Sequence, residues 1–166
     1  AMLEGEHRPG FFTGVATVVN KLFNIVQPDI ALFGEKDFQQ LLVIRQMVKD
    51  LAMPVEIRSV ATVREASGLA MSSRNHYLDN KQLRQAAALH DCLVRVVKLL
   101  AEGDHPNDEV GHACQALEEK GFRDDYVVVR RRQDLAVPGV DDRALIVLAA
   151  VWLGNVRLID NISFEL

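Results

Sequence analysis

The sequence has few cysteines, one tryptophan and no long apolar run. Two cysteines among 166 residues are too few for a disulfide-stapled scaffold. Cys92 and Cys114 fall inside helical patterns, so we expect both to be reduced and buried. No apolar run reaches the roughly 18 residues of a membrane-spanning helix. Residues 1–10 are polar and charged, so we expect no signal peptide and a cytoplasmic protein.

A strong charge of one sign and metal-ligand spacing are also missing. The net charge of −4 argues against a general nucleic-acid binder, although a few placed Lys and Arg side chains can still hold ATP. His105 and His112 lie seven residues apart without partners at a zinc spacing, so we predict no metal site. The share of apolar residues, 49%, indicates a soluble globular protein.

Residues 12–60 alternate between helical and strand patterns. Thr13 can cap the first helix, and Asp37 with Gln40 three residues later resembles a capping box for the second. Alternating helices and strands are typical of a parallel α/β sheet, and two apolar strands need further partners on that sheet. The predicted elements are a helix from Thr13 to Val26, a strand at 30–33, a helix from Asp37 to Leu51 and a strand at 55–60.

The rest of the chain indicates a small α+β domain that follows a polar loop at residues 64–77. Asp79 and Gln82 mark the start of a long helix, and Gly103 and Gly121 mark helix ends. The predicted elements are a helix from Asp79 to Leu100, a helix from Pro106 to Leu117, a strand at 126–129, and a hairpin of strands 144–152 and 156–159 around residues 153–155.

The segment FGEKDFQQL, residues 33–41, combines a strand end, a glycine and a helix start. Ligands of open α/β sheets bind at the carboxyl ends of strands, and helix amino termini favour anions. Lys36 is suited to a phosphate, while Asp37 and Gln40 offer hydrogen bonds. The alternative is an ordinary turn in which Asp37 is only a cap and Lys36 is solvated.

The segment LAMSSRN, residues 69–75, places two hydroxyls beside a guanidinium. Ser72, Ser73 and Arg74 can make charge-assisted hydrogen bonds to a phosphate. The alternative is a polar linker with a helix cap. Because Leu69 and Met71 are its few apolar anchors, we expect the loop at residues 66–75 to be a mobile lid that orders on ATP.

GEKDFQQL followed by VREASGLAMSSRNHYL resembles the pantothenate synthetase family, also called pantoate–β-alanine ligases. The resemblance extends to RPGFFTGVATVVNKLFNIVQPD before these motifs and to RLIDN near the end. The MSSR stretch is similar to the KMSKS-type loop of the nucleotidyltransferase superfamily. The resemblance therefore covers nearly the whole chain.

The resemblance implies an α/β fold and a ligase. Residues 1–66 would be the carboxy-terminal part of a Rossmann-like domain for ATP and pantoate, and residues 67–166 a small α+β lid domain. The family uses ATP with Mg²⁺ to adenylate pantoate, then β-alanine attacks the pantoyl adenylate to give pantothenate, in the coenzyme A pathway. Its members are usually homodimers and form an amide bond with release of AMP.

The resemblance also implies roles for individual residues. Lys36 would face the ATP phosphates, Gln40 would bind pantoate, and the backbone of Val63 would meet adenine. The implied catalytic residues are Lys36, Ser72, Ser73 and Arg74. The implied ATP-binding residues are Gly34, Glu35, Lys36, Asp37, Val63, Met71, Ser72, Ser73 and Arg74.

Two departures from the family pattern stand out. The HxGH-type motif and the first pantoate-binding glutamine of the amino-terminal half are not present, so we expect an incomplete part of a longer protein that is inactive by itself. Phe11 stands where the family usually carries histidine, and Thr13 where many members have arginine or alanine. The alternatives are a related adenylate-forming or nucleotidyl-transfer enzyme with another acid, and a non-catalytic binding module of the same fold.

Overall fold

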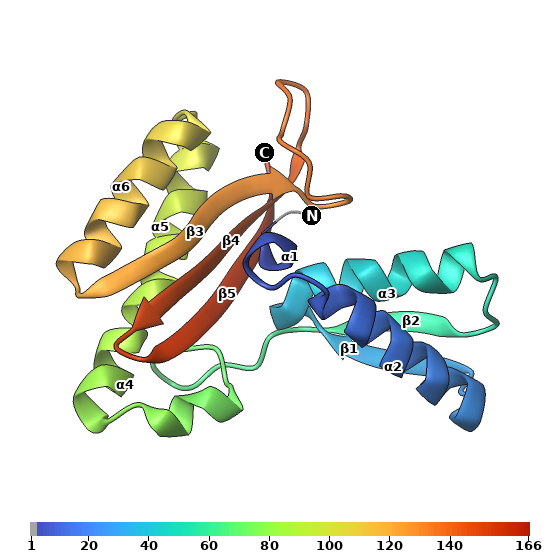
Figure 1. The fold of residues 1–166 in the computed structure, drawn as a ribbon. Coiled ribbons are helices and arrows are strands. Elements are labelled where there is room, and N and C mark those ends of the chain that lie inside the picture. Colours follow the sequence, from blue (N-terminus) through green and yellow to red (C-terminus); the bar gives the residue numbers. More distant parts are fainter. Residues whose placement is uncertain (1–2) are drawn as a thin grey trace. The chain divides into compact units, whose positions relative to one another are not determined.

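Two units make up the part of the chain that the structure, a computed structural model, describes, namely residues 3–166 (Figure 1). Contacts within the chain separate the units between Thr62 and Val63. The predicted domain boundary lay between residues 66 and 67. The difference arises because Arg64 is bonded inside the second unit, to Gly68 and Asp160.

The first unit is a two-stranded parallel sheet with helices, as the alternating pattern predicted. Each strand of five residues pairs with the other in register from Ile30 opposite Glu56 to Gly34 opposite Val60. The elements are α1 (Glu4–His7), α2 (Phe11–Val26), β1 (Ile30–Gly34), η1 (Glu35–Asp37), α3 (Phe38–Asp50) and β2 (Glu56–Val60).

One face of this sheet is covered and the other is exposed. Phe23 of α2 meets Phe33 of β1 edge to face, with ring centroids 6.3 Å apart, and α3 buries Leu41 and Ile44. The opposite face carries Leu32, which is 66% exposed, together with Ile30 and Val60. The same face also carries the exposed Glu56–Arg58 ion pair, so the open face of the sheet is partly apolar and partly charged.

Two predicted helix caps do not form. α2 begins at Phe11, after Gly10 with φ +78°, and Thr13 lies inside the helix, where its carbonyl accepts a hydrogen bond from Thr17 Oγ1. The Asp37 side chain makes no capping hydrogen bond, because the short η1 helix comes between β1 and α3. The Asp37 carboxylate is therefore exposed at the end of the strand and is not used as a cap.

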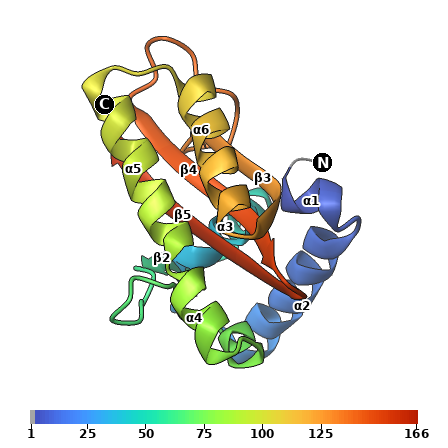
Figure 2. The same ribbon diagram turned by 90° about the vertical axis from the view of Figure 1, so that its left-hand side faces the viewer.

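The second unit is an antiparallel sheet in the order β3–β4–β5 with helices on one face, as Figures 1 and 2 show. Its helix-covered core takes alternate residues of the strands, among them Val147, Val151 and Leu158, together with Leu93 and Leu117. The elements are η2 (Ser73–Tyr77), α4 (Asn80–Ala86), α5 (Ala88–Glu102), α6 (Pro106–Glu119), β3 (Phe122–Arg131), β4 (Ala144–Leu153) and β5 (Val156–Glu165).

The helix caps, helix ends and turn predicted for this unit are largely confirmed. Asp79 and Gln82 form the full capping box at α4, and Gly103 ends α5 with φ +104°. The single long helix predicted from Asp79 was wrong, because it is interrupted at Ala87. The hairpin turns at Gly154, whose φ of +58° suits the first central position of a type II′ turn.

Both cysteines are free and half-buried, whereas full burial was predicted. Cys92 Sγ donates to the Ala113 carbonyl at 3.6 Å. Burial raises the pKa of both thiols, and that of Cys114 rises to about 11, with the Asp124 carboxylate as a further cause. No helix among residues 3–166 is both long enough and apolar enough to cross a bilayer.

Two valines of α5 give a matched test of this core. Val96 is 2% exposed and Val94 is 47% exposed. We expect Val96→Ala to lower the free energy of unfolding by about 2 kcal/mol, because it removes buried methyl groups and leaves a cavity. Val94→Ala should change it by less than about 0.5 kcal/mol. Urea denaturation of both variants measures the difference, and equal losses would contradict the assigned burial.

The Cys114 thiol predicts an alkaline loss of stability. Its pKa in the folded protein, about 11, lies above the ordinary value of 9.0, so the folded state holds the proton more tightly than the unfolded chain. This contribution is fully present below pH 9 and is lost as the pH rises toward 11. Urea midpoints measured across this range should fall more steeply for the wild type than for Cys114→Ala. Parallel profiles for the two proteins would rule the effect out.

Candidate active site

The first group of predicted site residues lies together at the carboxyl end of β1. Gly34 closes the strand, and Glu35, Lys36 and Asp37 form η1 directly after it. Gln40 follows in the first turn of α3. The strand end therefore presents two carboxylates, one ammonium and one amide within one short segment, as the sequence predicted.

Gly34 leaves room beside this strand end. A Cβ atom built on it would meet no atom within 4 Å, and its φ of −69° is one that any residue can adopt. Neither packing nor backbone conformation therefore requires glycine here. The open space is compatible with close approach of a ligand to the backbone.

The second group lies in the second unit, on a small hairpin. Met71 N donates to the Val63 carbonyl at 2.9 Å, and Arg64 and Ala70 form an isolated antiparallel bridge. Leu69 and Ala70 are buried, whereas Met71 is 49% exposed. The apolar anchors of the loop are thus Leu69 and Ala70, and the prediction that Met71 is an anchor was wrong.

The polar tip of this loop is held at both ends. Ser72 Oγ accepts a hydrogen bond from Arg74 N at 3.2 Å, at the start of η2. Buried Asn75 donates from Nδ2 to the Ala70 carbonyl at 3.1 Å. Ser73 and Arg74 are exposed between these points, and no carboxylate among residues 3–166 forms an ion pair with the Arg74 guanidinium.

Phe11, the departure from the family pattern, stacks with a cation. The Arg8 guanidinium carbon lies 3.7 Å from the centroid of the Phe11 ring, which is within cation–π range. Phe12 contacts the same ring at 5.1 Å between centroids. The first turn of α2 therefore presents a guanidinium on an aromatic ring where the family usually carries imidazole.

An ion pair with the buried Asp160 ties the start of the small hairpin to β5. Arg64 donates from Nη1 to Asp160 Oδ2 at 2.7 Å and from Nη2 to Oδ1 at 2.9 Å. The same Nη1 donates to the Gly68 carbonyl at 3.1 Å. The Asp160 side chain is 2% exposed, and His90 Nδ1 of α5 lies 3.5 Å from Oδ2.

Sequence reasoning missed Arg64, His90 and Asp160 as a group. Arg64 and Asp160 lie 96 positions apart, so no local spacing connects them. The available signal was an acidic residue inside the apolar strand pattern RLIDNI, because a buried carboxylate requires a partner.

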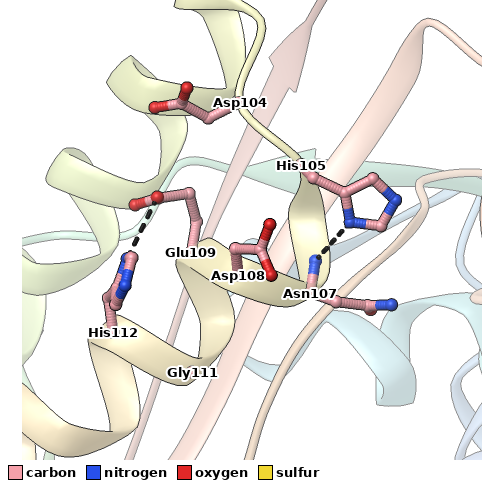
Figure 3. Close-up of a pocket in the computed structure, with 7 residues that line it drawn as sticks. All are labelled: Asp104, His105, Asn107, Asp108, Glu109, Gly111 and His112. Atoms are coloured by element: carbon pink, nitrogen blue, oxygen red, sulfur yellow. Dashed lines mark hydrogen bonds and ion pairs between the residues drawn. The ribbon is translucent and has the colours of Figure 1, made fainter.

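A separate open hollow of about 540 Å³ lies at the start of α6 (Figure 3). His105 and His112 both line it, although the sequence suggested that they were isolated. His105 Nδ1 accepts from Asn107 N, and His112 Nδ1 lies 3.2 Å from Glu109 Oε1. No group of three metal-ligating side chains occurs among the described residues, and His105 caps the start of α6 at this hollow.

Known proteins match nearly the whole chain, including both candidate segments. A model of the pantoate–β-alanine ligase family matches residues 1–163. A pantothenate synthetase of Shewanella loihica is 54% identical over 161 residues, which cover 97% of this chain and 57% of the relative. The chain thus spans somewhat more than half the length of this relative.

Solved structures agree with the fold. Pantothenate synthetase from Thermus thermophilus matches with a TM-score of 0.90 and 42% identity, over 98% of this chain and 59% of that one. Pantoate–β-alanine ligase from Francisella tularensis, complexed with β,γ-ATP and β-alanine, matches with a TM-score of 0.75 and 30% identity, over 97% and 53%. Because the family model matches residues 1–163, the chain belongs to the pantoate–β-alanine ligase family.

Proposed function

We propose that this chain is part of an ATP-dependent ligase that joins pantoate to β-alanine through a pantoyl adenylate. The observation that carries the proposal is that the family match includes both the β1 end with Lys36 and the loop with Arg74. The ATP analogue and β-alanine in the Francisella tularensis relative support these ligand classes. The chain would supply the carboxy-terminal part, and the HxGH motif would come from a further part.

The proposed chemistry has two balanced steps. A pantoate carboxylate oxygen attacks the α-phosphorus of ATP, and pyrophosphate leaves as the mixed anhydride forms. The β-alanine amine then attacks the activated carbonyl carbon, the amide bond forms, and AMP leaves while the amine loses a proton. Because both steps move charge onto phosphate oxygens, catalysis depends mainly on positioning and charge neutralisation.

In this proposal the residues of the chain divide the work. Gly34, Glu35 and Asp37 would line the nucleotide beside Lys36, and Gln40 would hydrogen-bond pantoate. Lys36 would neutralise phosphate charge at the end of β1. The proposed remaining ATP contacts are the backbone of Val63 and the side chains of Met71, Ser72, Ser73 and Arg74.

Mg²⁺ would enter with ATP as a counterion of its phosphates. The described residues offer no cluster of three metal-ligating side chains. Mg²⁺ commonly binds through one or two carboxylates together with substrate phosphates, so such a cluster is not required. The expected homodimer and the cytoplasmic location stay predictions.

The proposal predicts that the chain alone is inactive. Incubated with ATP, Mg²⁺, pantoate and β-alanine, the 166-residue chain should release AMP far more slowly than about 1 per second, a typical enzymatic rate. The positive control is a protein in which this chain follows the amino-terminal part of the Shewanella loihica relative. Enzymatic turnover by the chain alone would contradict the assigned division of the site, and an inactive control would contradict the proposed function.

Substitution of Lys36 tests the phosphate site in that longer protein. Lys36→Ala should slow ATP–pyrophosphate exchange by roughly 30- to 900-fold, because a charge-assisted contact that strengthens in the transition state is worth about 2–4 kcal/mol. Lys49→Ala, at the far end of α3, removes an exposed lysine of the same unit and should leave the exchange rate unchanged. Equal rates in the two variants would withdraw the role of Lys36.

A further inference from the structure

Buried Asp160 makes several polar contacts, although the strand around it is largely apolar. Its carboxylate accepts two hydrogen bonds from Arg64 and one from Asn161 N at 2.8 Å, and His90 Nδ1 lies 3.5 Å away. Such a carboxylate is costly to bury unless its lone pairs are filled. Its strongest partner comes from the segment that leads into the nucleotide loop.

Arg64 transmits this attachment to the loop. The residue before it, Val63, accepts the Met71 amide at 2.9 Å, and Arg64 itself bridges Ala70. The Arg64 guanidinium also holds the Gly68 carbonyl at the turn of the hairpin. Fixing Arg64 on Asp160 therefore fixes Met71, the first residue of the proposed phosphate-binding stretch.

Gly68 allows the same hairpin to pack closely against α5. Its φ is +88°, and a Cβ atom built on it would lie 3.0 Å from His90 Cδ2. The turn thus packs on the His90 ring so closely that any side chain at position 68 would displace it. His90 Nδ1 is buried without a hydrogen-bond partner among the described residues, so its ring is held here by Asp160 and by packing.

We propose that Arg64 and Asp160 are positioning residues, which hold Met71–Arg74 in the conformation that receives the ATP phosphates before ATP binds. This inference rests on the proposed function and makes it more specific. It replaces the expectation of a loop that orders only on ATP. The stretch is tied at one end by Met71 to Val63 and at the other by Asn75 to Ala70, so Ser72, Ser73 and Arg74 project from a braced turn.

The first test needs no nucleotide. Hydrogen exchange on the 166-residue chain should find the amides of Gly68, Met71 and Asn75 protected, because each donates to a backbone carbonyl. In Arg64→Met/Asp160→Leu these three amides should exchange at least about tenfold faster, while the β4–β5 amides keep their rates. Replacing both charges by apolar groups avoids leaving one unpaired, so the unit stays folded.

The second test asks whether the Arg64–Asp160 pair affects ATP binding. In the longer protein, the double variant should raise the KM for ATP about tenfold if the competent loop population falls to about a tenth, with the KM for pantoate within about twofold. Gly68→Ala disturbs the packing of the hairpin against His90. It should likewise raise the KM for ATP and leave the KM for pantoate nearly unchanged. Arg64→Lys, which keeps the charge but not the paired geometry, should recover part of the ATP KM.

Arg132→Met is the matched control. It removes an exposed ion pair of the same sheet, Arg132 Nη2 to Glu165 Oε1 at 2.7 Å, and should change neither loop exchange nor either KM. Unaltered loop exchange in the double variant overturns the proposal, and so does an equal rise in both KM values or a loss of folding throughout the unit. An inactive wild-type longer protein would refute the proposed function, while the exchange experiment would still decide whether the pair holds the loop.

Discussion

A carboxylate that has lost its water must be surrounded by donors, and Asp160 imposes that requirement on the second unit. Desolvation of such an ion costs several kcal/mol, which only well-placed partners offset. The donors come from Asn161 on the same strand and from Arg64 on the loop, and the His90 ring of α5 packs beside them. One side chain therefore determines where three parts of the chain meet.

The apolar core around this carboxylate has a different part in the fold. Val147 and Val151 of β4 and Leu158 of β5 bury their side chains on the helix-covered face of the sheet, and burial of such apolar area stabilises the fold. Apolar packing is not directional, and it would accept several attachments of a polar loop to the sheet edge. A bidentate ion pair permits only one such attachment, because both guanidinium nitrogens must face both carboxylate oxygens.

The sequence predicted the elements better than the contacts between them. Helical spacing, Gly103 and the Asp79–Gln82 pair each act within a few residues, so they indicated helix ends that the structure confirms. The cap assigned to Asp37 failed because a short η1 turn intervenes, a choice that depends on how the strand end is packed. The Arg64–Asp160 pair could not be predicted, because its members are joined only through the fold of the sheet.

The candidate site shows the same difference between local sequence signals and long-range contacts. The segment Gly34–Asp37 was found from sequence because a strand end, a glycine and a helix start are adjacent in the chain. The loop of Ser72, Ser73 and Arg74 was found from its residue types and the family motif, but its bracing was not. A predominance of small polar residues suggested mobility, and the sequence indicated Leu69 but not Ala70 as a buried anchor of the loop.

The proposed bracing would lower the free energy that nucleotide binding must supply. Ordering one residue of a free loop costs about 1–2 kcal/mol, so a disordered stretch from Met71 to Arg74 would oppose binding by several kcal/mol. In the structure that cost is met during folding, by the core contacts of Leu69 and the ion pair of Asp160. The phosphate contacts proposed for Ser72, Ser73 and Arg74 can then contribute to affinity and to transition-state stabilisation instead of to ordering the loop. A loop built in this way gains its precision from residues that touch no substrate.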